Sequence, residues 1–265
     1  MATVLAVANQ KGGVAKTTTV ASLGAALVGL GQRVLVVDLD PQGCLTFSLG
    51  HNPDRLERSV HDVLLGDAEI ADVLLETGEN LALLPATIDL AGAEALLLMR
   101  PGREYALKRA LAVVEDDYDI IIVDCPPSLG VLTLNGLTAA RAVLVPLQCE
   151  TLAHRGVGQL LRTVDEVKQI TNPDLEMLAR YPPCTTRGPP TAATCSPMYP
   201  IGTACPSSHH RSRGPCGSPK HRRRRDRPVG TQEQGAHAYR ELAENLLACW
   251  TDGAEPVTLA VQAEA

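Results

Sequence analysis

Residues Asn9 to Thr19 read NQKGGVAKTTT, a glycine-rich stretch between an apolar run and a segment predicted to be helical. Glycines let backbone N–H groups close around phosphate oxygens, and a following helix points its positive end at the same place. Lys16 can neutralise phosphate charge, and the Thr17 hydroxyl suits a magnesium ion. The stretch therefore predicts a phosphate-binding loop, with a glycine-rich surface turn as the plainer alternative.

Strands and helices alternate on both sides of this loop. Predicted buried strands cover residues 3–8, 33–37, 81–84, 120–123 and 142–145, and predicted helices cover residues 17–30, 90–99, 104–115, 132–140 and 156–170. Such alternation indicates an α/β fold, a mostly parallel, doubly wound sheet with helices on both faces. Ligands of these sheets bind beyond the carboxyl ends of the strands, so functional residues should follow strands.

Two acidic motifs follow predicted strands. VVDLDPQG (residues 36–43) holds Asp38 and Asp40, two apart and so on the same side of an extended chain. VDCPPSLG (residues 123–130) holds Asp124, and its Cys125 has no nearby cysteine partner, which favours a plain buried thiol over a cluster ligand. A lone D-x-D is often only a solvated turn, but three motifs in order, each after a strand, favour a nucleotide site.

The loop departs from the common pattern G-x-x-x-x-G-K-[ST], because Gln10 and Ala15 stand where its glycines would be. Its own pattern is K-G-G-x-x-K-T-T, with Lys11 ahead of the glycines. Together with VVDLDPQG and VDCPPSLG, it resembles the ParA/Soj partition ATPases, P-loop NTPases of the deviant Walker A type within the group that includes MinD. The resemblance covers residues 1 to about 178 and resumes at about 235. Ala15 is a mild departure, since many members have glycine there.

The resemblance implies roles for particular residues. Lys11 would reach across an ATP-sandwich dimer to the partner's nucleotide, Lys16 would bind phosphates, and Asp40 would position the attacking water. The implied cofactors are ATP and Mg²⁺. The implied metal site comprises Thr17, Asp38 and Asp124, the last acting through water, and the implied nucleotide-binding loop comprises Gly12, Gly13, Val14, Ala15, Lys16, Thr17 and Thr18.

Residues 179–230 differ in composition from the rest of the chain. They hold ten of the 24 Lys and Arg residues, one of the 30 Asp and Glu residues and ten of the 19 prolines. Their only Leu, Ile or Val residues are Ile201 and Val229, too few for a compact core. We therefore divide the chain into an ATPase core (1–178), an anomalous and irregular segment (179–232), a closing helix of the same domain (233–250) and a flexible tail (251–265).

Three interpretations fit the anomalous segment, which includes the basic run KHRRRRDRPVG (residues 220–230). A zinc module is weakly supported, because its four cysteines are about ten residues apart, without a C-x-x-C pair. A disordered basic arm could bind DNA through its charge. Out-of-frame translation of GC-rich DNA would also give a segment rich in Arg, Pro, Cys and Gly.

The frame hypothesis can be checked against the genetic code. When the frame is moved one base earlier, residues 181–191 can be read as V-P-T-M-Y-D-A-R-T-T-H and residues 216–223 as V-R-F-A-E-A-S-A. Both strings resemble ParA-type sequences at these places. We favour a one-base loss near codons 178–180 and a compensating gain near codons 228–235, which makes the arginine run an accident of translation and predicts impaired function.

Further expectations concern partners and location. The resemblance implies a homodimer, a ParB-like centromere-binding partner and non-specific DNA binding that segregates chromosome or plasmid DNA. The chain shows neither a signal-peptide pattern nor an apolar run of membrane-span length, which predicts a cytoplasmic, nucleoid-associated protein without a membrane partner. Two alternatives are an inactive remnant or non-enzymatic binding fragment, and a MinD-like membrane-cycling ATPase, which the acidic tail disfavours.

Overall fold

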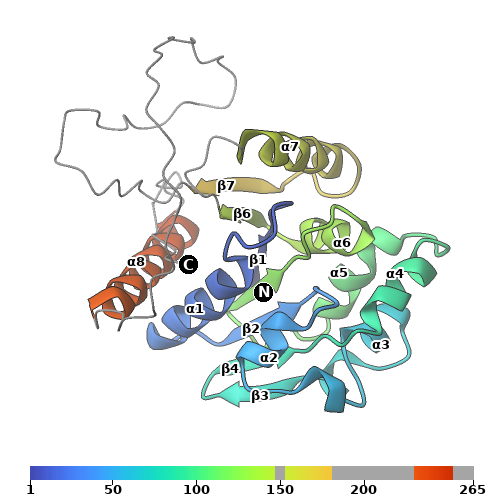
Figure 1. The fold of residues 1–265 in the computed structure, drawn as a ribbon, viewed down its shortest axis with the longest axis horizontal. Coiled ribbons are helices and arrows are strands. Elements are labelled where there is room, and N and C mark those ends of the chain that lie inside the picture. The colour runs from blue at the N-terminus through green and yellow to red at the C-terminus, as the bar shows by residue number, and fades with distance from the viewer. Residues whose placement is uncertain (147–152, 181–229, 253–265) are drawn as a thin grey trace, which may run out of the picture.

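The computed structural model describes residues 1–146, 153–180 and 230–252, which build one seven-stranded sheet flanked by helices (Figure 1). The strand order is β3-β4-β2-β5-β1-β6-β7, and every neighbouring pair is parallel except β3 and β4. The strands are β1 Thr3–Val7, β2 Val34–Asp38, β3 Leu75–Gly78, β4 Leu81–Leu84, β5 Ile120–Asp124, β6 Ala142–Pro146 and β7 Glu176–Arg180. This confirms the predicted α/β class.

Helices cover both faces of the sheet. The α-helices are α1 Lys16–Gly29, α2 Cys44–Ser48, α3 Val60–Leu65, α4 Leu90–Leu97, α5 Ala106–Leu111, α6 Val131–Ala139, α7 Ala153–Ile170 and α8 Gly230–Asp252, with short 3-10 turns η1 Pro53–Arg55, η2 Ile70–Asp72 and η3 Arg103–Tyr105. Helices α1 and α8 lie on one face, and α3 to α7 lie on the other (Figure 1). Successive strand residues point to opposite faces of the sheet and so belong to two separate hydrophobic cores. Leu5 and Val7 pack in the core that contains α1, whereas Ala6 packs in the core on the other face.

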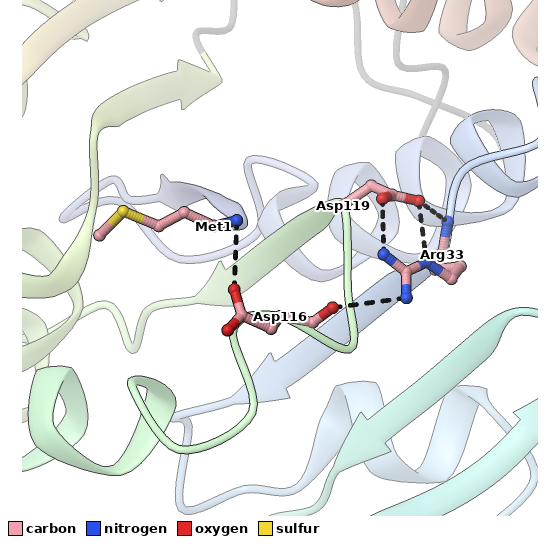
Figure 2. Close-up of polar contacts among 4 residues, drawn as sticks. All are labelled: Met1, Arg33, Asp116 and Asp119. Carbon is pink, nitrogen blue, oxygen red and sulfur yellow. Dashed lines mark hydrogen bonds and ion pairs between the residues drawn. The ribbon is translucent and has the colours of Figure 1, made fainter.

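Ion pairs join residues at the amino ends of the central strands (Figure 2). The Arg33 guanidinium contacts the Asp119 carboxylate at 2.9 Å, and its backbone N–H donates to the same side chain. The α-amino group of Met1 lies 3.4 Å from Asp116. These exposed pairs link the starts of β1, β2 and β5, but salt screening keeps their contribution to stability small.

The predicted strands and helices are all present, and all but the strand over 81–84 have shifted ends. The helix expected over 104–115 is the largest difference, because it consists of η3, α5 and a series of turns. In those turns Val113 and Val114 donate to carbonyls three residues back, so the α-helical pattern ends at Leu111. Elements α2, α3, β3 and β7 were not predicted. A capping box at Ser59 and Asp62 is the sequence signal that could have indicated α3.

Helix α8 returns the chain to the sheet after the anomalous segment. Tyr239, Leu242, Ala243 and Leu246 recur at helical spacing and are buried against α1 and the sheet. Most of the segment predicted to be irregular, residues 181–229, lies outside the described residues; β7 continues through Arg180, and α8 begins at Gly230. None of the described helices is long and apolar enough to cross a membrane.

Candidate nucleotide site

The phosphate loop connects β1 to α1 at the carboxyl edge of the sheet. Gly13 and Ala15 have φ values of 74° and 62°, in the left-handed region. Glycine adopts this conformation freely, whereas alanine is strained in it, so Ala15 occupies a position suited to glycine. A Cβ at Gly12 or Gly13 would meet no atom within 4 Å, so the loop backbone is open to a ligand. Lys16 begins α1, where unpaired N–H groups favour anions.

Polar contacts hold the beginning of this loop. The buried Asn9 accepts the Lys11 backbone N–H at 3.0 Å and donates to the Pro146 carbonyl at 2.6 Å. The Lys16 ammonium lies 3.4 Å from the Lys11 carbonyl. Gln10 donates to Gln159 of α7 at 2.9 Å. The loop is therefore fixed to neighbouring elements through its first half.

Two predicted acidic residues end neighbouring strands. Asp38 of β2 and Asp124 of β5 are register partners, and Val7 of β1 is the partner of Asp124 on the other side. Because β1, β2 and β5 are adjacent and parallel, their carboxyl ends bring the phosphate loop and both acidic motifs to one edge. Both carboxylates are buried.

Asp124 is the unusual group of the site. Among the described residues, neither of its carboxylate oxygens has a hydrogen bond of normal geometry, although the side chain is only 1% exposed. Burial raises the pKa of Asp124 to about 7; the nearby Thr17 hydroxyl lowers it, Asp38 raises it, and Lys16 lowers it. Buried polar groups without partners are rare in proteins and point to a missing ligand.

Asp38 has a different environment, because both of its oxygens are engaged. One accepts the Asp40 backbone N–H at 3.1 Å, and the other accepts the Thr46 N–H and hydroxyl at 2.9 and 2.8 Å. Burial raises the pKa of Asp38 to about 6, against the effect of these hydrogen bonds. The Asp38 carboxylate therefore organises the turn that carries Asp40 and α2, and its predicted role as a metal ligand stays a prediction.

Asp40 and Lys16 complete the charged centre. Asp40 is partly exposed, and one of its oxygens accepts the Gln42 N–H at 3.0 Å. Burial lowers the pKa of Lys16, while the charges of Asp124 and Asp40 raise it. The three charged groups thus act on one another electrostatically.

The donor set fits a magnesium ion held together with phosphates. The described residues contain no group of three His, Cys, Asp or Glu side chains able to hold a metal by themselves. Magnesium in phosphate sites is usually bound by one or two protein oxygens, substrate phosphates and water. Asp124 with its unpaired oxygens and Thr17 at the start of α1 meet that need, and the open backbone at Gly12 and Gly13 leaves room for phosphates.

Most of the predicted site residues belong to this centre. Residues 12–18 form the loop and first turn of α1, with Lys16, Asp40 and Asp124 electrostatically coupled. Val14 is buried and anchors the loop, whereas Thr18 is exposed. Sequence reasoning missed Asn9, Thr46 and Gln159, because a hydrogen-bond partner 40 to 149 residues away leaves no local signal. Cys125 is a buried thiol whose pKa is raised by burial, as expected.

Fold and site together define a P-loop nucleotide-binding protein. Residues 2–177 match the family model described as AAA domain. Soj of Bacillus subtilis is 52% identical over 176 residues, which cover 66% of this chain and 70% of Soj. ParA of Myxococcus xanthus is 48% identical over 66% of this chain and 62% of that relative. The chain belongs to the ParA/Soj family of partition ATPases, and by this resemblance it is an ATPase.

Solved structures with bound nucleotide share this fold. A Mycobacterium smegmatis protein named cobyrinic acid a,c-diamide synthase, with bound ATP analogue and magnesium, is 52% identical with a TM-score of 0.77, covering 99% of this chain and 100% of that one. The Cyanothece McdA–ATP complex is 26% identical with a TM-score of 0.64, covering 69% and 70% of the two chains. Both ligands agree with the Mg-ATP expected from the sequence.

Proposed function

We propose that this chain binds Mg-ATP, dimerises around the nucleotide and binds DNA non-specifically in that state, so that it segregates chromosome or plasmid DNA. The observation that carries the proposal is Asp124, a buried carboxylate without a hydrogen-bond partner among the described residues, beside Lys16 and Thr17. A ParB-like centromere-binding protein would stimulate hydrolysis, and DNA binding would place the protein on the nucleoid. Family membership supports this wider scheme.

Within this scheme the chain supplies charge and position. Lys16 binds the phosphates, Thr17 and Asp124 hold the magnesium ion, and bound magnesium supplies positive charge beside the phosphates. Asp40 has one oxygen engaged with Gln42 and orients the attacking water with the other. Lys11 reaches the nucleotide of the partner subunit, which makes dimerisation necessary for hydrolysis.

Thermal unfolding with and without Mg-ATP tests the nucleotide site. A ligand at 100 times its Kd stabilises the folded state by about 2.7 kcal/mol, which should raise Tm by several degrees. Lys16→Ala should abolish the increase, whereas Lys108→Ala, a change at an exposed lysine of α5, should preserve it. An equal increase in Lys16→Ala and in the unchanged chain would contradict the proposed site.

A second candidate is a binding fragment without turnover. The observation that favours it is the end of the family match at residue 177, beside the change in composition. A chain of this kind would be stabilised by Mg-ATP but would release no phosphate, even with DNA and a ParB-like partner. Phosphate release above that of Lys16→Ala would exclude it.

ATP-dependent amide synthesis is the activity that the name of the M. smegmatis protein suggests. If such a reaction took ammonia from an amide donor by thiol attack, it would need a reactive cysteine thiolate with a lowered pKa. Of the three described cysteines, Cys44 and Cys125 have a pKa that burial raises, which is the opposite of what such a thiol needs. We therefore prefer the partition function, and ADP release that depends on DNA rather than on a carboxylate acceptor and an amide donor would support this choice.

A further inference from the structure

We propose that Asn9 is a positioning residue that, with Gln10, fastens the first half of the phosphate loop to β6 and α7 and thereby fixes Lys11. The inference rests on the proposed function, in which Lys11 acts on a nucleotide. It assigns a task to two residues that touch neither phosphate nor metal in that scheme. It also makes α7 part of the machinery that positions the loop.

Asn9 uses both ends of its amide. Its nitrogen donates to the Pro146 carbonyl at the carboxyl end of β6, and its oxygen accepts the Lys11 N–H. The side chain is only 4% exposed, so water cannot easily replace either hydrogen bond. A carboxylate would lose the donor and a hydroxyl would be too short to span both partners, so asparagine is the side chain that fits.

Gln10 adds a second attachment on the next residue. Its side-chain nitrogen lies 2.9 Å from the Gln159 oxygen on α7, and both groups come from segments 149 residues apart in the chain. The Lys11 carbonyl, in turn, faces the Lys16 ammonium at 3.4 Å. The backbone of Lys11 is therefore held on its amino side by Asn9 and on its carboxyl side by the lysine that binds phosphate in our scheme.

Two glycines follow Lys11 in the loop. Gly12 and Gly13 are exposed, and the space beside each is open to at least 4 Å. Glycine has wider conformational freedom than any other residue, so hydrogen bonds at Asn9 and Gln10 order the loop just before its intrinsically most flexible part. Without the attachments at Asn9 and Gln10, we expect the loop backbone at Lys11 to be less ordered and Lys11 to reach a partner's nucleotide less often.

Hydrogen exchange of the nucleotide-free chain tests this arrangement without any activity. In Asn9→Ala, the Lys11 amide should exchange about tenfold faster or more, since a buried hydrogen bond is lost. Gln159→Ala alters an exposed side chain, so it should leave the fold intact and increase exchange at residues 10–13 by a smaller factor. Asn172→Ala is the matched control, because that buried asparagine donates to Leu137 and Ala140 away from the loop.

Two results would overturn the inference: unchanged exchange at Lys11 in Asn9→Ala, or an equal increase there in Asn172→Ala. Because the measurement needs no nucleotide, it decides the question even if Mg-ATP fails to stabilise the chain and the proposed function is wrong. Asn9→Asp keeps the acceptor and loses the donor. It should show intermediate exchange, which keeps the test valid if Asn9→Ala folds poorly.

A second measurement links Asn9 to turnover. Asn9→Ala should keep ATP affinity within about threefold of the unchanged chain, because Lys16 and Thr17 are intact, yet lose phosphate release to the level of Lys11→Ala. Asn172→Ala should keep both properties. Loss of turnover in Lys11→Ala with full turnover in Asn9→Ala would refute the positioning role and leave the proposed function standing.

Discussion

Asp124 is almost completely buried, and neither of its carboxylate oxygens makes a hydrogen bond of normal geometry within the described part of the chain. An ionised carboxylate in that position destabilises the nucleotide-free fold. We expect Asp124→Asn to raise the stability of the nucleotide-free protein at pH 8 and to abolish stabilisation by Mg-ATP. Urea unfolding with and without Mg-ATP measures both effects, and a variant that is both less stable and still responsive to Mg-ATP would contradict the expectation.

The same residue predicts a pH dependence with a definite sign. The pKa of Asp124 is about 7 in the folded state against an ordinary 3.8, so the folded chain binds the proton more tightly than the unfolded chain. The stability that Asp124 contributes is therefore greatest below about pH 4 and is lost as pH rises to about 7, by on the order of 4 kcal/mol. The pKa of Asp38 is also raised, to about 6, but this affects the unchanged chain and Asp124→Asn alike. The difference in stability between the two proteins therefore follows Asp124, and the stability gained in Asp124→Asn should shrink from pH 8 towards pH 5.

The backbone conformation at Ala15 predicts that Ala15→Gly makes the folded protein more stable. Its φ of 62° strains any side chain with a Cβ, so Ala15→Gly should stabilise the protein by about 0.5 to 1 kcal/mol after the entropy lost by glycine. Ala25→Gly, at an exposed position inside α1, should destabilise it by about 1 kcal/mol. Thermal unfolding compares the two, and equal signs would argue against the left-handed conformation at residue 15.

Helices α1 and α8 are joined by a hydrogen bond between segments 220 residues apart. The hydroxyls of Thr19 and Tyr239 lie 3.3 Å apart in a buried position. Thr19 is two residues after the predicted magnesium ligand Thr17. We expect a double-mutant cycle of Thr19→Val and Tyr239→Phe to give a coupling of about 1 kcal/mol in unfolding. Additive effects would show that the two hydroxyls are not hydrogen-bonded in solution and would contradict this contact between α8 and α1.

The frame-shift hypothesis makes a prediction about the stability and activity of the whole protein. The corrected gene, with one base added near codon 179 and one removed near codon 230, should encode a protein with higher Tm and with phosphate release stimulated by DNA. The physical reason is that apolar strand and helix residues would replace a segment with only Ile201 and Val229 as its Leu, Ile or Val residues. Resequencing the gene across codons 170–240 comes first, and an unchanged sequence with full activity would favour a functional basic arm.

Much of the fold could be predicted because strong patterns lie within short stretches. The buried strands read as unbroken apolar runs, and parallel strands bring their following loops to one edge, so Lys16, Asp38 and Asp124 could be assigned to one site. Less regular elements were not predicted from the sequence. Strand β3 pairs antiparallel with β4 through a bulge, and α2 has only five residues. Such elements are set by neighbours rather than by periodicity.

The sequence by itself determined the family, the α/β class, the phosphate loop and the residues that carry charge at the nucleotide site, because these depend on residue type and local spacing. Tertiary structure alone decided how those charges behave. Asp38 and Asp124 are both aspartates at strand ends, yet Thr46 satisfies the first and no described residue satisfies the second. The tether from Asn9 to Pro146 likewise joins residues 137 apart. Hydrogen-bond partners and burial arise only when distant segments pack together, so no local pattern can encode them.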